Sequence, residues 1–508
     1  MNEIIDNLKL ADETSQRQQA NKISDKDSLL GVIFAICAGF LADKVIFSGL
    51  TGIGFSLLMC NFILLYLFML KSKLKLTGNK GLLWIIPILI IAFRSTFYDN
   101  MPIQGLNVLV LPILMTGAAI IIWCPHIQFD KAIFLLEIWS HIILFPLINC
   151  GKIFTSIKRL IPSKKRQNSI KLNPHIAMGL LFSIPLLFIV IVFLSSADMM
   201  FNYYVMEFFD ALDISRYLKI SDITIIHLII ITFISIYSFA FVWSFVERKA
   251  SAPYNDGTKL EVEALTISIP VALINIIYLL FSIVQFSYLY GGGSLPSGFT
   301  YAEYARKGFF ELVAVTVINF SIILIGVNRT KTSSKKMGIF CNILYSLLIV
   351  FTLSMLYSAN YKMRLYENTY GYTYLRVYVH LFMILLLILN LGAMCALWYK
   401  KINLYKSALI ITIIFYSTVN LFNVDGYIAK ENIEIYRING KIDAQYLTNL
   451  SNDALPYLVE LSTDSNENVR QIIKQDLDLR CQRLNDAQNN TSILQFSFSR
   501  HRAKKLLN

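Results

Sequence analysis

The stretch Tyr378-Val-His-Leu-Phe-Met-Ile-Leu-Leu-Leu-Ile-Leu-Asn-Leu-Gly-Ala-Met-Cys-Ala-Leu-Trp398 is almost entirely apolar and contains no Asp, Glu, Lys or Arg. A helix of this length spans the roughly 30 Å hydrocarbon core of a bilayer. Similar runs recur between residues 29 and 422. They are continuous, whereas the strands of a membrane barrel alternate between polar and apolar residues. The chain is therefore predicted to be all-α, as a polytopic transmembrane helix bundle.

The composition agrees with this fold and argues against several functions. Of the 508 residues, 56% are hydrophobic and 16% are charged, against roughly 25% charged in soluble domains. The net charge of +13 lies in short loops between apolar runs, so the lipid bilayer is the expected partner and nucleic acid is not. No C-x-x-C or H-E-x-x-H occurs among the 7 cysteines and 6 histidines, so neither a metal site nor a cofactor is predicted.

The charges of the loops bear on how many apolar runs cross the membrane. If every run crosses, the basic loops at 71–80 and 152–171 fall on opposite sides, against the positive-inside bias. The run at 131–149 is the weakest span, because it carries Glu137 and flows into the second basic loop. Residues 128–161 are therefore interpreted as a cytoplasmic interfacial helix. The apolar runs, about twelve in number, lie at 29–50, 52–70, 81–93, 103–123, 131–149, 175–196, 223–246, 264–288, 308–327, 338–358, 378–398 and 405–422.

The resulting topology has about eleven spans in the plasma (inner) membrane, with the N-terminus cytoplasmic and the C-terminus extracytoplasmic. Residues 1–28 are polar and lack a cleavage pattern, so they are expected to form a cytoplasmic tail before an uncleaved first span. Two alternatives remain open. Twelve spans would put both ends inside, and failure of the short run at 81–93 to cross would put the N-terminus outside.

Residues 423–508 differ from the transmembrane domain at 29–422, because they are polar and show helical patterning at 443–461 and 466–486. They are predicted to form a small helical appendix on the outer surface of the membrane domain. The basic residues Arg500 to Lys505 are expected to be disordered. One apolar stripe in the appendix comprises Leu447, Leu450, Leu455, Leu458 and Leu461.

Three polar stretches stand at the ends of long apolar runs, and the same topology puts all three on the outer side. Each mixes acids or arginines with tyrosines, where a connecting loop would need only turn residues. They are Gly298-Phe-Thr-Tyr-Ala-Glu-Tyr-Ala-Arg-Lys307, Arg364-Leu-Tyr-Glu-Asn-Thr-Tyr-Gly-Tyr-Thr-Tyr-Leu-Arg376 and Asn423-Val-Asp-Gly-Tyr-Ile-Ala-Lys-Glu-Asn432.

These stretches supply a candidate outer polar cluster for binding. Glu311 lies a turn inside its span, so it should pair with a cation, either Lys307 nearby or Arg364 or Arg376 from the second stretch. Arginine forks in turn bind carboxylates or phosphates. Structural alternatives are a capping box at Glu303, an ordinary interfacial tyrosine belt, a purely structural ion network and helix capping by Asn423 or Asp425. The candidate residues are Asp198, Glu303, Arg306, Lys307, Glu311, Arg364, Tyr366, Glu367, Tyr370, Arg376 and Asp425.

At these residues the chain resembles a family of bacterial polytopic membrane proteins, domain of unknown function 4173, related to 4153. The resemblance covers about 175–460 and implies a protein of the bacterial cell envelope, without implying an activity. In that family a proline follows Asp198 and another separates Asn423 from Asp425, where this chain has Met199 and Val424. The resemblance rests on Ser196-Ala-Asp198, Gly298 to Leu312, Arg364 to Arg376, Asn423-Val-Asp425 and Lys441 to Pro456.

Three hypotheses for function follow, in decreasing order of support. The first is outward-facing binding or transport of an anionic or lipid-like envelope substrate by the polar cluster. The second is a membrane enzyme that acts on a lipid-linked substrate, with Asp43 and Asp198 as the acids. The third is a signalling or scaffold protein whose outer tail at 443–486 contacts a partner protein. The chain has no P-loop or nucleotide-binding fingerprint, so signalling would need such a partner.

Overall fold

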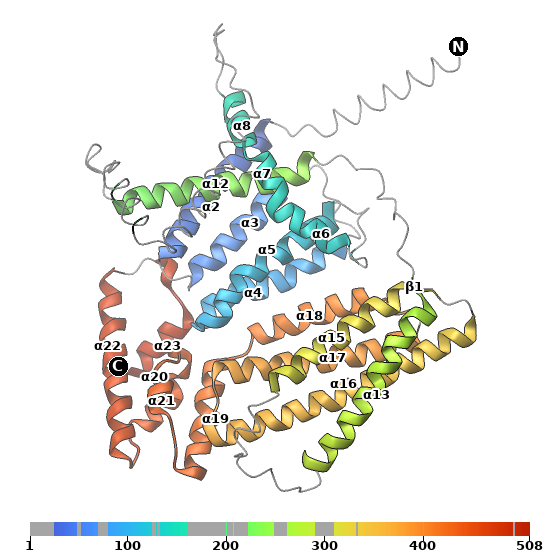
Figure 1. The fold of residues 1–508 in the computed structure, drawn as a ribbon. Coiled ribbons are helices and arrows are strands. Elements are labelled where there is room, and N and C mark those ends of the chain that lie inside the picture. The colour runs from blue at the N-terminus through green and yellow to red at the C-terminus, as the bar shows by residue number, and fades with distance from the viewer. Residues whose placement is uncertain are drawn as a thin grey trace, which may run out of the picture. The chain divides into compact units, whose positions relative to one another are not determined.

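The computed structural model is helical through almost all of the residues that it describes (Figure 1). The chain folds into two compact units. Unit 1 comprises residues 1–85, 109–127 and 135–251, and unit 2 comprises residues 86–108, 128–134 and 252–508. The described residues are 25–47, 52–69, 80–123, 129, 133–160, 200, 207, 222–247, 262–289, 309–331, 334–399, 401–490 and 493–507.

In unit 1, α2 packs between α3 and α12. A close approach of α2 to α12 is possible because residue 39 is glycine. A Cβ at Gly39 would overlap the hydroxyl of Ser235 and the carbonyl of Ile231, both on α12. Small residues at such crossings allow membrane helices to pack backbone to backbone. The elements of this unit are α2 (Asp25–Phe47), α3 (Ile53–Met69), η2 (Lys80–Trp84), most of α5 (Met101–Trp123), α6 (Ile133–Trp139), η3 (Ser140–Leu144), α7 (Phe145–Asn149), α8 (Lys152–Leu160) and α12 (Asp222–Glu247).

In unit 2, the long helices α16 and α17 run antiparallel and are joined by a tight turn at Gly371, whose φ of 74° suits glycine. Asn432 on α19 holds this turn, accepting from the Tyr372 N–H at 2.8 Å and donating to the Tyr372 carbonyl at 2.9 Å. The elements are α4 (Ile85–Phe97), the start of α5, β1 (Val262–Glu263), α13 (Ala264–Leu289), α15 (Phe309–Arg329), β2 (Thr330–Lys331), α16 (Lys335–Tyr370), α17 (Tyr374–Trp398), α18 (Leu404–Asn420), α19 (Val424–Asn439), α20 (Ala444–Thr448), η4 (Asn452–Ala454), α21 (Leu455–Leu461), α22 (Glu467–Asn490), η5 (Ile493–Gln495) and α23 (Phe498–Leu507).

The apolar helices confirm an all-α membrane protein. Among the described residues, 6 helices are long and apolar enough to cross a bilayer, or up to 7 if the bent pair α18 and α19 forms one span. The count of about eleven spans stays a prediction, because the expected span at 175–196 lies outside the described residues. Shorter apolar helices at Ile53–Phe68, Gly81–Phe97, Phe134–Asn149 and Glu311–Val327 account for further expected runs.

The segment expected to be an interfacial helix forms α6, η3 and α7 in series, followed by α8. One face of the segment is tied to α12. His141 is completely buried, lies 3.0 Å from the Ser244 hydroxyl and stacks on Phe245, and Tyr237 donates to the Ile142 carbonyl. These contacts explain His141 by helix packing. Whether the segment crosses or lies along the membrane stays a prediction.

The leucine stripe of the C-terminal segment is confirmed, since all five leucines are at most 3% exposed. They do not lie on one helix, however. The chain breaks after α20 at Asn449, Leu450 lies between α20 and η4, and α21 carries the last three leucines. Four of them share a core with Ile103 at the start of α5 and Val377 at the start of α17. The C-terminal helices therefore build their core jointly with the ends of the apolar helices.

The expectation of disorder at Arg500 to Lys505 is wrong, because these residues form most of α23. Ser497 begins the helix by accepting the N–H of Arg500 at 3.2 Å, and its hydroxyl donates to Asp99 at 3.0 Å. Asp99 also lies 3.5 Å from Arg500. The sequence shows a basic terminus. Asp99, the acid that lies against Arg500, comes about 400 residues earlier in the chain, so no local pattern connects the two.

Candidate functional site

The helix break between α18 and α19 is the first notable feature of unit 2. The two helices differ in direction by 68°. The guanidinium of Arg94, a buried cation on α4, donates to the carbonyls of Asn420 at 2.8 Å and Phe422 at 3.3 Å. These carbonyls belong to the end of α18, where a helix dipole attracts cations. Asn423 caps the start of α19, accepting the Gly426 N–H at 2.9 Å, so the predicted cap is confirmed for this residue.

Asp425, in the first turn of α19, is completely buried and holds three other segments together. It accepts from the Asn100 amide at 2.5 Å, from the Ser451 N–H at 3.1 Å and from the Tyr374 hydroxyl. Tyr378 donates to the other end of the Asn100 amide at 2.9 Å. A buried carboxylate that accepts this many hydrogen bonds holds its partners in place and is not available to bind a ligand. Asp425 therefore fixes the start of α17 and the C-terminal helices against α19.

A second buried acid, Asp453 in η4, has a raised pKa. Burial raises the pKa of Asp453 to about 6, and the neighbouring carboxylates of Asp99 and Asp425 act in the same direction. Its Oδ2 accepts the Asp99 N–H at 2.8 Å, and Arg502 approaches its Oδ1 at 3.5 Å. The folded protein consequently takes up a proton at Asp453 at a higher pH than the unfolded chain does.

This shift predicts a pH dependence of stability. Because the folded pKa is raised, the unfolded state binds fewer protons between about pH 4 and 6, and stability falls as pH rises through that window. We expect Asp453→Asn to remove the cost of ionisation and to raise the free energy of unfolding at pH 7 by about 1–3 kcal/mol. Thermal unfolding in detergent at pH 4.5 and pH 7 checks this. A gap between variant and wild type that is equal at both pH values would contradict it.

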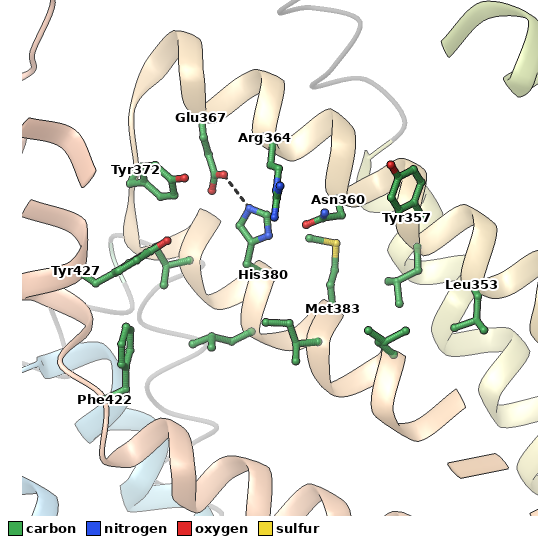
Figure 2. Close-up of a pocket in the computed structure, with 15 residues that line it drawn as sticks. Leu353, Tyr357, Asn360, Arg364, Glu367, Tyr372, His380, Met383, Phe422 and Tyr427 are labelled. Carbon is green, nitrogen blue, oxygen red and sulfur yellow. Dashed lines mark hydrogen bonds and ion pairs between the residues drawn. The ribbon is translucent and has the colours of Figure 1, made fainter. Parts of the chain in front are cut away.

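The cavity of unit 2 lies along α16 and α17 and has a volume of about 570 Å³ (Figure 2). Its α16 residues recur every three or four positions, from Leu353 to Glu367, so they share one helix face. The break between α18 and α19 contributes the side chains of Phe422 and Tyr427. The lining comprises Leu353, Leu356, Tyr357, Asn360, Arg364 and Glu367 on α16, Tyr372 in the turn, Val377, His380, Leu381, Met383, Ile384 and Leu387 on α17, and Phe422 and Tyr427.

The charged lining residues and His380 lie at one end of this cavity. Near the α16–α17 turn it carries Arg364, Glu367 and His380, which Figure 2 shows grouped together, whereas Leu353 and Met383 lie further along the helices. Leu353 and Glu367 are separated by roughly 20 Å along the helix axis, from the rise of 1.5 Å per residue. The cavity is therefore amphiphilic, with its polar end at the helix termini and its apolar end toward the middle of two membrane-spanning helices.

Glu367 is the most unusual residue of the polar end, because it is completely buried. Its Oε2 accepts from the His380 Nε2 at 2.8 Å, and its Oε1 has no hydrogen-bond partner within the described part of the chain. Burial raises the pKa of Tyr372, and the charge of Glu367 acts in the same direction, so this hydroxyl is a neutral donor. A buried oxygen without a donor is costly and is expected to meet one from water or a ligand.

The residues of the second polar stretch fall into two groups. Arg364 and Glu367 line the cavity. Arg376 instead lies 4.3 Å above the ring of Tyr366 and donates to the carbonyls of Tyr370 and Gly371. Its cation therefore closes the turn, and the structural alternative describes it better than the binding one.

The first polar stretch, with Glu303, Arg306 and Lys307, lies outside the described residues, and so does Asp198. Glu311 is described and is exposed on α15, where its charge acts on Lys362 of α16. The expected partner of Glu311 was Lys307, Arg364 or Arg376. Lys362 was not among the expected partners, although a lysine inside a long apolar helix is a signal in itself.

Several residues of the site and its surroundings were not predicted from sequence. His380 stands within the apolar stretch that begins at Tyr378, and Arg94 directly follows the apolar run at 81–93, so both could have been noted as polar groups beside or within apolar runs. Asn100 and Asn360 carry no such signal. Asp43, a candidate of the enzyme hypothesis, belongs to unit 1, where it lies 2.6 Å from Nδ1 of His227 and is 2% exposed.

These features define a helical, multi-pass membrane protein with a broken helix and an amphiphilic cavity. The family model for a domain of unknown function (DUF4153) matches residues 81–461, which is most of the chain, and the protein belongs to this family. The match includes α16, α17, the helix break and the buried acids Asp425 and Asp453. No curated protein and no solved structure matches the chain.

Proposed function

We propose that the protein binds an anionic, lipid-like envelope substrate in the cavity along α16 and α17, and presents or transports it. The observation that carries this proposal is the arrangement of Arg364 and the unpaired Oε1 of Glu367 at one end of a cavity whose other end is apolar. An amphiphilic lipid has the same arrangement, with a charged headgroup at one end and an apolar chain at the other. Its anionic headgroup would meet Arg364, a donor on the headgroup would meet Glu367, and its chain would follow the leucine and methionine side chains.

The membrane position of the cavity supports the same ligand class. The polar end lies beside the turn between two spans, where headgroups lie in a bilayer, and the apolar end extends along the helices. A lipid that moves from the bilayer into the cavity would thus keep its headgroup and its chain at the same depths in the membrane. The ligand's charge must be balanced locally, since a bare anion at such depth is expensive.

Binding of an anionic amphiphile tests the proposal. Arg364→Ala should weaken binding of a fluorescent short-chain phosphatidylglycerol to the purified protein by roughly 10- to 100-fold, because a charge-assisted hydrogen bond contributes about 1.5–3 kcal/mol. Fluorescence anisotropy in detergent measures the affinity. Arg437→Ala is the matched control, because Arg437 forms an exposed pair with Glu460 on the C-terminal helices, outside the cavity. Equal effects of the two changes would leave the cavity without a role.

The orientation belongs to the proposal as well. Loop charges favour about eleven spans, with the polar end of the cavity and the C-terminal helices extracytoplasmic, and the tyrosine- and arginine-containing motifs favour the 4173 branch of the related families. We expect a membrane-impermeant maleimide to label Cys481, on α22, in intact cells. Cys481→Ser is the control, since other cysteines are partly exposed. Labelling that requires lysis would instead place α22 in the cytoplasm.

A further inference from the structure

Helix α23 exposes one face that combines aromatic, basic and aliphatic residues. The exposed positions are 498, 501, 502, 505 and 506, a spacing of three and four that defines a single helix face. They are Phe498, His501, Arg502, Lys505 and Leu506. The opposite face is buried through Ser499 and Ala503, each 1% exposed. An apolar stripe interrupted by cations, on a helix held at its back, is typical of helices that lie in a membrane interface.

The exposed face of α23 continues the exposed apolar surface of α4. In α4, the large exposed side chains of unit 2 are Ile86, Phe93 and Phe97, whose spacing puts them on one face. Phe97 stacks on Phe498 with ring centroids 5.3 Å apart, and Arg502 donates to the Phe97 carbonyl at 3.2 Å. α23 is therefore attached at the level where the apolar surface of α4 ends, which is where lipid headgroups begin.

The charges of α23 are divided between its two sides. Arg500 is directed toward the buried Asp99, at 3.5 Å. Arg502 approaches Asp453, yet its side chain remains 59% exposed, and Lys505 is exposed as well. Beside them, Ile493 of η5 is 86% exposed. Apolar side chains this exposed are unfavourable in water but are accommodated at the bilayer boundary, and the adjacent cations attract anionic headgroups.

We infer that the exposed face of α23, with η5, binds anionic phospholipid at the membrane surface and so anchors the C-terminal helices to the bilayer. The surface is separate from the cavity along α16 and α17 and needs no substrate there. A soluble protein partner is the competing occupant. It is disfavoured because Phe498 continues the apolar surface of α4, which a water-soluble partner would not reach at the level of the lipid.

Depth measurement tests the inference. A fluorophore sensitive to polarity is attached to Leu506→Cys in a chain whose 7 native cysteines are replaced, and the protein is placed in lipid nanodiscs. Brominated phospholipid should quench this label at least several-fold more than one on Gln471→Cys, an exposed position of α22. Quenching should increase when phosphatidylglycerol replaces part of the phosphatidylcholine. Equal, weak quenching at the two positions would overturn the inference.

A second measurement keeps the native cysteines. In the Arg364→Ala background, which removes the headgroup contact in the cavity, added phosphatidylglycerol should still raise the melting temperature in detergent. Lys505→Glu should abolish that rise, because it reverses the charge at this position. Lys505→Arg should keep the rise, because it keeps the positive charge. A rise that survives Lys505→Glu would overturn the role of α23. Weaker anisotropy binding of the fluorescent short-chain phosphatidylglycerol in the Arg364→Ala chain, with the Lys505-dependent rise retained, would support two separate sites.

Discussion

Replacing Asp425 by alanine is expected to lower the free energy of unfolding by about 3–5 kcal/mol, the largest effect on stability of any single change proposed. The carboxylate is completely buried and accepts from a side-chain amide, a backbone N–H and a tyrosine hydroxyl. Alanine would leave all three donors buried without an acceptor, and each such donor costs about 1–3 kcal/mol. Thermal unfolding of the purified protein in detergent measures the loss.

The effect should extend from stability to the cavity. Asp425 stands between Phe422 and Tyr427, and both of these aromatic side chains line the cavity. Release of Asn100, Ser451 and Tyr374 would free the start of α19, so binding of the anionic amphiphile should weaken together with stability. Glu460→Ala is the matched control, because Glu460 is an exposed acid whose pair with Arg437 contributes little. Equal melting temperatures for Asp425→Ala and the wild type would contradict the assigned role.

How much of this could be predicted from sequence depends on the range of the interaction. Local signals sufficed for the apolar helices and for the Asn423 cap, because each depends on residues within one or two turns. The spacing of the leucines also predicted their burial, but not the break in the chain at Asn449. The partners of Asp425 did not follow, since Asn100 lies in another polar junction, between α4 and α5, with no pattern that links the two positions. Pairing across such distances is set by tertiary packing alone.

The second polar stretch shows the same limit at short range. Its composition predicted a cluster of arginines, acids and tyrosines, and the structure divides that cluster at Gly371. The turn directs Arg376 back onto Tyr366 and the carbonyls before it, while Arg364 and Glu367 face the cavity from α16. Helical spacing places Arg364 and Glu367 on one face, but the direction of the turn depends on Asn432, which no local pattern connects to it.

Glu367→Gln is expected to have the largest effect on ligand choice with little effect on folding. Glutamine is nearly the same size and keeps an oxygen that can accept from the His380 Nε2, now bonded to Oε2 at 2.8 Å. It replaces the unpaired Oε1 by an amide nitrogen, so a buried acceptor at the polar end of the cavity becomes a donor. Binding of phosphatidylglycerol, whose headgroup carries hydroxyl donors, should weaken by roughly 10- to 100-fold.

The discriminating comparison uses phosphatidylmethanol, which has the same phosphate charge but no hydroxyl in its headgroup. Its affinity should change little in Glu367→Gln and fall in Arg364→Ala, because only the arginine would contact the phosphate. His380→Ala should weaken binding of phosphatidylglycerol less than Glu367→Gln does, since the imidazole, which also lines the cavity, holds the other oxygen of Glu367. Parallel losses of the two lipids in Glu367→Gln would mean that the buried acid acts through the shape of the cavity. The unpaired oxygen would then be satisfied by water, and headgroup recognition would rest on Arg364 alone.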